Sequence, residues 1–345
     1  MKKISVLFSA VFLFLFFALP VMAFDVLPGA PYVPKDNPMS AAKIELGKQL
    51  FFDPRLSLDG TISCNSCHNV MSSGTDNRSV SVGVGGKKGG RSAPTVWNAA
   101  FLSSQFWDGR AATLEDQAKG PILAGVEMAM PSEEAAVNRI KSIPGYVQSF
   151  SAVFGGDDPV TYDNIAKAIA TYERTLITIN SPFDRFQRGD KSALSTSAKR
   201  GMETVEKLGC TSCHNGPNFS GPDLSVGQVF LQKFPTYSNN DYVEKYNLID
   251  DLGRYNVTKV EADKNMWRVP SWRNIALTAP YFHNGSVETL DEAIRVMAKT
   301  QLNKDVSAAQ VSDIKAFLNS LTGEFPAQTM PRLPDYDYSS IVAMD

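Results

Sequence analysis

The sequence of 345 residues contains only three histidines and four cysteines, and it has no excess of positive charge. Its 34 Lys and Arg residues are offset by 36 Asp and Glu residues, which gives a formal net charge of −2 at pH 7. Such a balance lacks the positive field that nucleic acid or an anionic membrane surface selects, so it argues against both partners. Strand patterns are also few, whereas a hydrophobic content of 43% allows a sizeable core.

The N-terminal segment predicts export. Residues 1–26 read MKKISVLFSAVFLFLFFALPVMAFDV, with two lysines, a long apolar run, Pro20 and a small-residue stretch that suits cleavage after Ala23. We interpret residues 1–23 as a signal peptide. The alternative is an uncleaved anchor, because residues 4–23 are about long enough to span a bilayer. Export would place the cysteines in an oxidising compartment, where two disulfides are the ordinary expectation.

The arrangement of the cysteines argues against disulfides. Residues 64–69 read CNSCHN and residues 210–215 read CTSCHN, so two hexapeptides hold all four cysteines and two of the three histidines. A redox dithiol needs no following histidine, and a zinc site of four thiols would leave both histidines without a role. Covalent haem c explains every member, because two thiols form thioethers while the adjacent imidazole coordinates iron. We predict two haem c groups, held by Cys64, Cys67 and His68 and by Cys210, Cys213 and His214.

The segments around the two clusters have helical periodicity. Residues 40–52 begin at Ser40 as N-cap and lead toward the first cluster, and residues 192–210 run from a Ser/Thr-rich start into the second. Residues 159–177 carry an apolar stripe, residues 180–190 read as a connection, and residues 307–323 form a helix capped by Ser307 and stopped by Gly323. The pattern predicts a mostly α fold with a repeated cytochrome c-like order of helix followed by haem motif.

The second axial ligand decides what each haem does. In residues 287–302, which read VETLDEAIRVMAKTQL, Thr289 and Glu292 form a predicted capping box, and Met297 lies two turns further on. A single methionine is more often a core residue than a ligand. Because it follows the second haem motif, we interpret Met297 as the sixth ligand of that haem, a ligation that raises the reduction potential.

Several longer stretches point to one family. They read FFDPRLS, CNSCHN, RSAPTVWNAAF, QFWDGRAATLEDQAKGPI, GVEM, SPFDRF, RVPSWRNIALTAPYFHNGSVETLDEAIRVM and FLNSLTGEFP. They closely resemble the bacterial di-haem cytochrome c peroxidases, a group that includes the MauG-type enzymes. The resemblance implies two cytochrome c-like domains with one covalent haem c each, over residues 24–185 and 186–345, with the C-terminal tail packing back on the first domain. It also implies a periplasmic enzyme that reduces hydrogen peroxide with electrons from a small c-type cytochrome or cupredoxin.

The resemblance further implies roles for single residues. His214 and Met297 match the ligands of the electron-transfer haem, and His68 matches the ligand of the peroxidatic haem. Trp107 matches the tryptophan between the haems, and Glu127 matches the distal acid. A desolvated carboxylate in that place can take a proton from one peroxide oxygen and return it to the other. MauG-type members have tyrosine in place of the methionine, so Met297 favours a peroxidase.

The chain also departs from the family. The glycine-rich loop that usually carries a histidine cap for the peroxidatic iron reads SVSVGVGGKKGGRSAPT here, and Val84 or one of its neighbours stands at the matching place. We therefore expect the N-terminal haem to be open in the oxidised protein. Lys87 or Lys88 could cap the iron instead, although exposed lysines are the commoner state.

The resemblance implies one calcium ion between the domains. The family uses main-chain oxygens that match Thr278 and Pro280, together with an asparagine whose counterpart is Ser92. A serine hydroxyl is a weaker calcium ligand than an amide oxygen placed further out.

Other assignments stay open from the sequence. For His283, the remaining histidine, we expect a hydrogen-bonded position between the domains rather than an iron ligand. Two alternative functions are a di-haem electron carrier without catalysis and a MauG-like oxidase of a protein side chain. A homodimer is compatible with the sequence, which does not fix the oligomeric state.

Overall fold

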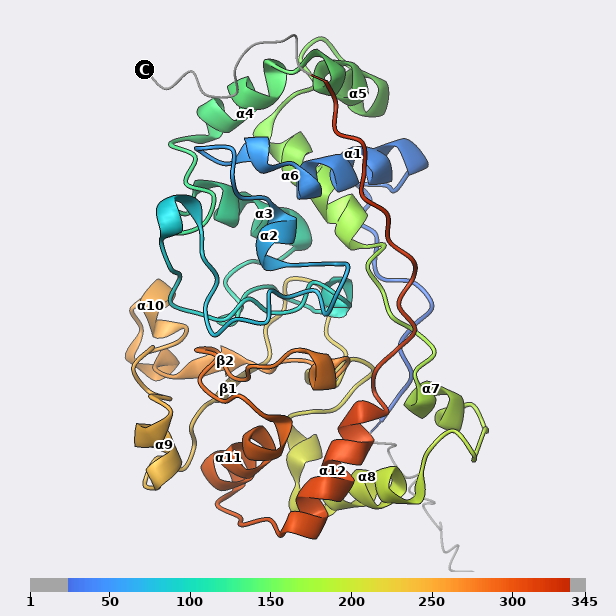
Figure 1. Ribbon diagram of the computed structural model, residues 1–345, viewed down its shortest axis with the longest axis vertical. Helices are drawn as coiled ribbons and strands as arrows, with labels where there is room; N and C mark the ends of the chain where they lie inside the picture. Colours follow the sequence, from blue (N-terminus) through green and yellow to red (C-terminus); the bar gives the residue numbers. More distant parts are fainter. Residues whose placement is uncertain (1–23, 336–345) are drawn as a thin grey trace, which may run out of the picture.

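The computed structural model describes residues 24–335, and the predicted signal peptide at residues 1–23 lies outside them (Figure 1). The prediction of a mostly helical fold is confirmed for the described residues. In that part of the chain the regular strands are β1 (Leu231–Lys233) and β2 (Met266–Arg268), which form one antiparallel pair. The helices are α1 (Ala41–Phe52), α2 (Cys64–Cys67), α3 (Leu114–Leu123), α4 (Glu133–Lys141), α5 (Pro144–Phe154), α6 (Tyr162–Glu173), α7 (Pro182–Gln187), α8 (Thr196–Leu208), α9 (Asp241–Lys245), α10 (Tyr255–Thr258), α11 (Leu290–Leu302) and α12 (Ala308–Asn319).

One hydrophobic core lies among α1, α3, α4, α5 and α6, in the blue and green part of Figure 1. Ser40 caps α1, because its hydroxyl accepts from the Lys43 N–H. Helices α1 and α6 approach so closely that a Cβ on Gly47 would collide with the Ala168 carbonyl. Gly47 therefore permits the close approach of α1 and α6, and α1 also contacts the first C-x-x-C-H segment at α2.

A second core lies among α8, α11 and α12, in the yellow and red part of Figure 1. Its centre is a group of aromatic rings from distant segments, in which Phe219 lies 5.3 Å from both Phe24 and Phe183 between ring centroids. Phe317 of α12 packs against the same rings. The predicted Ser307 cap of α12 is present, but the helix ends at Asn319 rather than at Gly323.

The chain after α12 runs back along the first core, as the dark red trace in Figure 1 shows. Phe325 packs edge-on against Trp97 with ring centroids 4.9 Å apart. Further along, the Tyr172 hydroxyl donates to the Gln328 side chain at 3.0 Å, and Arg55 donates to the Pro334 carbonyl at 3.0 Å. These contacts join the two cores along one side of the molecule.

Two local expectations are wrong. Residues 180–190 are not only a connection, because Ser181 and Asp184 form a capping box that begins α7. Thr289 does cap α11, but the side chain of Glu292 does not complete a capping box with it. Instead, the Glu292 carboxylate accepts from the Tyr246 hydroxyl at 2.7 Å. A tertiary partner therefore replaces the local one.

Among residues 24–335, no helix combines the length and the apolar character that crossing a bilayer requires.

Candidate functional site

A cavity of about 830 Å³ lies between the two cores and reaches both C-x-x-C-H segments. His68 and Glu127 line it on the side of the first core, and His214 and Met297 line it on the side of the second. Trp107 also lines it. The structure thus brings these five predicted residues to the walls of one space, whose size and largely apolar lining are those of a ligand or cofactor site.

His68 is fixed by the backbone of another segment. It ends the short helix α2, and its Nδ1 lies 2.9 Å from the carbonyl oxygen of Pro94. Because a carbonyl can only accept, Nδ1 carries the proton and Nε2 keeps its lone pair for a metal. Burial lowers the pKa of the imidazole, which keeps it neutral at physiological pH.

His214 has the same arrangement in the second half. Its Nδ1 lies 3.1 Å from the carbonyl oxygen of Phe219, and its ring stacks on Trp272 at 4.3 Å between centroids. Burial lowers the pKa of His214 to about 4. Met297 comes from α11, packs against the second core and lines the cavity as His214 does. Both imidazoles are therefore held in the neutral form that a metal ligand requires.

None of the four cysteines forms a disulfide in the structure. Burial raises the pKa of Cys64 and raises that of Cys210 to about 11. In the described part of the chain no three His, Cys, Asp or Glu side chains gather around a common point, so the four cysteines are not brought together as one zinc site would require.

The cavity walls suit haem. His68 from the first C-x-x-C-H segment and Cys210, Cys213 and His214 from the second line it, and each imidazole keeps the lone pair of its Nε2 for a metal. Indole and amide donors that have no partner among the described residues are also part of the wall, namely Trp97 Nε1, Trp267 Nε1 and Asn218 Nδ2. Buried donors of this kind need acceptors, and a haem carries two carboxylates. The apolar lining, the two imidazoles and the unpartnered donors each fit a bound haem.

Glu127 lies in the loop that follows α3. Its backbone is fixed twice, because its N–H donates to Ala124 at 2.9 Å and its carbonyl accepts from Val84 N–H at 2.9 Å. Burial raises the pKa of the Glu127 carboxyl, and the positive charge of Arg110 partly opposes this effect. The Arg110 guanidinium itself lies 3.4 Å from the centre of the Phe106 ring. Glu127 is thus a partly desolvated acid at the cavity wall.

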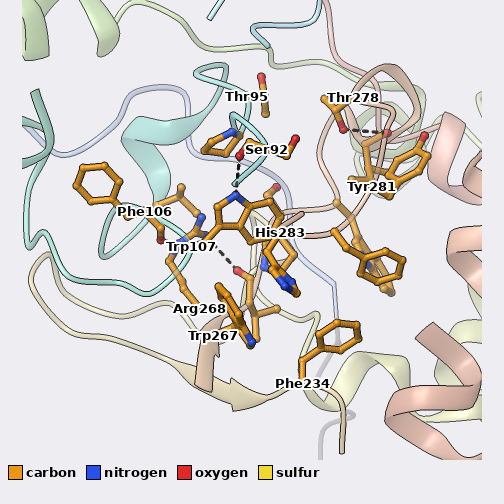
Figure 2. Close-up of a pocket in the computed structure, with 18 of the residues that line it drawn as sticks. Ser92, Thr95, Phe106, Trp107, Phe234, Trp267, Arg268, Thr278, Tyr281 and His283 are labelled. Carbon is orange, nitrogen blue, oxygen red and sulfur yellow. Dashed lines mark hydrogen bonds between the residues drawn. The ribbon is translucent and has the colours of Figure 1, made fainter. Parts of the chain in front are cut away.

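Trp107 is held by both halves of the molecule. Figure 2 shows its ring nitrogen directed at the Ser92 carbonyl, to which it donates at 2.8 Å. Its own carbonyl accepts at 2.9 Å from the N–H of Arg268, the last residue of β2. Nearby, Arg91 pairs with Asp108 and with Asp251 at 2.6 Å each, which links the two halves by charge. This network fixes the indole at the contact between the two halves.

The glycine-rich loop is anchored to the wall at one end and solvent-exposed at its tip. Val84 is buried, while Lys87 and Lys88 are exposed, which confirms the expectation for these lysines. Neither lysine lines the cavity. The contact with the wall comes from the backbone, since the Val84 N–H donates to the Glu127 carbonyl.

His283 is buried and lines the cavity, but its expected side-chain hydrogen bond is absent. Its ring stacks on Trp267 with centroids 4.2 Å apart, and its Nε2 has no partner among residues 24–335. The residue joins the two halves through its backbone, because its carbonyl accepts from Ser92 N–H at 2.7 Å. Burial lowers the pKa of the imidazole to about 4. Stacking, which was not foreseen, holds the ring in place.

The three predicted calcium ligands, Ser92, Thr278 and Pro280, all line the cavity. The Thr278 hydroxyl donates to Ile275 at 3.2 Å, and the neighbouring carbonyls of Leu277 and Ala279 accept from the Asn77 side chain. A cation here would depend on main-chain oxygens, because no acidic cluster is present in the described residues.

Sequence reasoning missed Glu173, which lines the cavity and is buried at 6% exposure. The pattern that could have revealed it is a charge on an apolar face, because Glu173 follows Ile165 and Ile169 at intervals of four residues. Its neighbour Arg174 pairs with a different carboxylate, that of Glu115, at 2.7 Å.

Comparisons with known proteins point to one family. The family model described as di-haem cytochrome c peroxidase matches residues 41–192. The chain is similar to cytochrome c551 peroxidase of Pseudomonas aeruginosa, with 44% identity over 301 residues, 87% of this chain and 84% of the relative. It is 35% identical to methylamine utilization protein MauG of Methylorubrum extorquens over 312 residues, 87% and 84% of the two chains. Among solved structures, a MauG-like protein associated with microbial copper homeostasis has a TM-score of 0.75 at 30% identity, over 89% of this chain and 95% of that one.

Proposed function

Because the chain belongs to the di-haem cytochrome c peroxidase family and is thus an oxidoreductase of the peroxidase type, we propose that it reduces hydrogen peroxide to water with electrons from a small redox protein. The observation that carries the proposal is the shared cavity. Two imidazoles whose Nδ1 atoms are held by backbone carbonyls line it, His68 from the first half and His214 from the second, and Trp107 and Glu127 line it as well.

Each C-x-x-C-H segment would hold one haem c through two thioethers and one imidazole, in a domain of residues 24–185 and a domain of residues 186–345. When bound, haem supplies the electron transfer and the iron site at which peroxide binds. On the second side Met297 would be the sixth ligand, a thioether that favours the reduced metal and suits electron entry. The protein supplies orientation, because Pro94 and Phe219 fix the two imidazole rings.

Glu127 would move the protons. Reduction of one peroxide consumes two electrons and two protons and yields two water molecules. The Glu127 carboxylate accepts the proton of the peroxide oxygen that stays in the site and returns it to the oxygen that leaves as water. Its raised pKa suits both roles, because the carboxyl then gains and loses a proton at a smaller free-energy cost. Arg110 is placed to stabilise its charged form.

Trp107 would connect the two sites and fix the position of one half relative to the other. Its ring binds the Ser92 backbone and its carbonyl binds the Arg268 backbone, so a shift of either half moves the indole. We propose that electrons pass from the C-terminal to the N-terminal half along this contact. A periplasmic location, a c-type cytochrome or cupredoxin as donor, a calcium ion near Ser92, Thr278 and Pro280, and a homodimer belong to the same proposal.

The first test counts haem and turnover in one preparation. The holoprotein should carry two haems that survive acid–acetone extraction, and it should consume peroxide with a reduced small c-type cytochrome or cupredoxin. Recovery of zinc or of a single haem would refute the site. Two haems without turnover would make the chain an electron carrier, and oxidation of a protein side chain in place of the donor would make it a MauG-like oxidase.

A further inference from the structure

The proposed mechanism leaves one buried carboxyl group in the cavity wall without a role. Glu173 is the last residue of α6, it is 6% exposed, and it lines the same cavity as His68. Its Oε2 has no hydrogen-bond partner among the described residues. Most buried acids are paired or hydrogen-bonded, so this oxygen calls for an explanation.

The nearest cation is neutralised by a different carboxylate. Arg174 donates to both oxygens of Glu115 at 2.7 and 3.0 Å, and the Asn37 amide donates to Glu115 as well. Burial raises the pKa of Glu173 to about 8, Arg174 opposes that rise and Glu115 adds to it. Glu173 is therefore a carboxyl group of raised pKa that lacks a counter-ion of its own.

The elements packed on α6 supply no other cation for this carboxyl group. From α2 the thiol of Cys64 faces it, and the negative charge of Glu173 contributes to the raised pKa of that thiol. Arg174 is held by Glu115 of α3. The lysines and the other arginine on α1, α3, α4 and α6 have partners elsewhere: Lys43 donates to Asn37 and Pro38, Lys48 to Thr329 and Arg139 to the carbonyls of Arg55 and Ser57, while Lys119 pairs with Asp163, Lys141 with Asp158 and Lys167 with Asp36.

We propose that Glu173 is a proton-exchanging acid of the N-terminal haem pocket, protonated while that haem is ferrous and ionised once it is ferric. The inference rests on the proposed function, because it requires a haem attached at Cys64 and Cys67. Loss of an electron adds one positive charge to a poorly solvated space, and a nearby positive charge favours the ionised form of a carboxyl group. Glu173 thereby releases one proton into the cavity for each electron that leaves the site.

This exchange keeps the net charge of the pocket nearly constant, because each electron that the N-terminal haem gains is accompanied by one proton and each electron that it loses is accompanied by the release of one. Glu173 and Glu127 then have separate roles. Glu127 transfers a proton between the oxygens of peroxide, whereas Glu173 offsets the change in charge when the N-terminal haem is oxidised or reduced. A carboxylate that was already paired, such as Glu115, could not make this exchange.

The test is a redox titration of the holoprotein from about pH 6 to about pH 10, a range that brackets the raised pKa. In the unchanged protein, the ratio of ferric to ferrous N-terminal haem at fixed applied potential should rise about tenfold per pH unit above the ferric-state pKa of Glu173 and level off above its ferrous-state pKa. In Glu173→Gln the ratio should stay at its low-pH value throughout. Glu45→Gln, an exposed carboxyl on the neighbouring helix α1, is the matched control and should behave as the unchanged protein.

An unchanged pH dependence in Glu173→Gln would overturn the inference. If that variant fails to take up haem, infrared difference spectra of the unchanged protein decide instead: reduction of the N-terminal haem should add a band of a protonated carboxyl, and its absence would refute the proposal. Haem content and peroxide turnover are measured on the same preparations. A protein with two haems and normal turnover but no pH dependence contradicts the role of Glu173 alone, whereas missing haem or turnover in the unchanged protein contradicts the proposed function.

Discussion

Replacement of Gly83 by alanine is the sharpest test of how Glu127 is positioned. Gly83 lies in extended backbone, with φ −98° and ψ −162°, so alanine can adopt its conformation. A Cβ there would lie 2.5 Å from the Glu127 carbonyl oxygen and 2.7 Å from the Glu127 Cα, and it would also meet the Val126 carbonyl. One methyl group therefore presses directly on the backbone of the proposed acid.

The size of the effect follows from this contact. Overpacking of this kind costs about 1–3 kcal/mol, and loss of the 2.9 Å hydrogen bond from Val84 to Glu127 adds about 0.5–1.5 kcal/mol. Because domains of this kind have about 5–15 kcal/mol of stability, the variant should remain folded. A displacement of roughly 1 Å at a catalytic group costs about 10²-fold in rate. We expect Gly83→Ala to lose about 10²-fold in kcat/KM for peroxide.

The assay is steady-state peroxide turnover, together with haem content and the reduction potential of the C-terminal haem. Gly90→Ala is the matched control, because it lies on the same loop and an added Cβ would have no atom within 4 Å. Its kcat/KM should stay within about twofold of the unchanged protein, since most surface substitutions cost little. Equal activities for the two variants would show that the loop does not position Glu127. A loss of haem in Gly83→Ala would show that the loop acts on assembly instead.

Three further predictions concern the ligands and the acid. Met297→His should lower the potential of the C-terminal haem while both haems stay attached, because sulfur favours ferrous iron more than imidazole does; a potential that does not move would show that Met297 is a core residue. Glu127→Gln should reduce kcat/KM for peroxide by about 10²–10⁴-fold. In the unchanged protein, activity should rise with pH through the raised pKa of Glu127, because its charged form is the base, and this rise should be missing in Glu127→Gln. The all-ferric protein should show a high-spin N-terminal haem in its EPR spectrum and react with peroxide before any reduction, whereas a purely low-spin spectrum would reveal a protein ligand in place of the missing histidine.

The sequence was sufficient to predict what depends on local pattern. The Ser40 and Ser307 caps, the helical segments and the two C-x-x-C-H clusters each follow from a few adjacent residues. Predictions failed where a distant partner replaced a local one. Glu292 bonds Tyr246 rather than its own helix start, and the His283 ring stacks on Trp267 instead of forming a hydrogen bond. Such choices depend on tertiary packing that no short window contains.

Glu173 illustrates a second limit of sequence reasoning. A glutamate followed by an arginine at a helix end reads as an exposed charged pair. The structure instead turns Arg174 toward Glu115, 59 positions earlier, and leaves Glu173 in the cavity wall. The direction of each side chain depends on where α3 crosses α6, so the charge without a partner becomes visible only when the fold is assembled.

The glycine-rich loop shows why loss of a side chain need not mean loss of a role. The side chain of Val84 cannot coordinate iron as histidine does. A comparison of side chains alone therefore suggests that the loop has no role at the site. Its link to Glu127, however, is made by the N–H of Val84 and by the bare Cα of Gly83. Neither depends on the side chain at position 84. A loop that does not have to leave the iron can hold Glu127 in place through its backbone. The absence of a histidine ligand and the fixed position of Glu127 therefore both favour an N-terminal site that can react with peroxide in the oxidised protein.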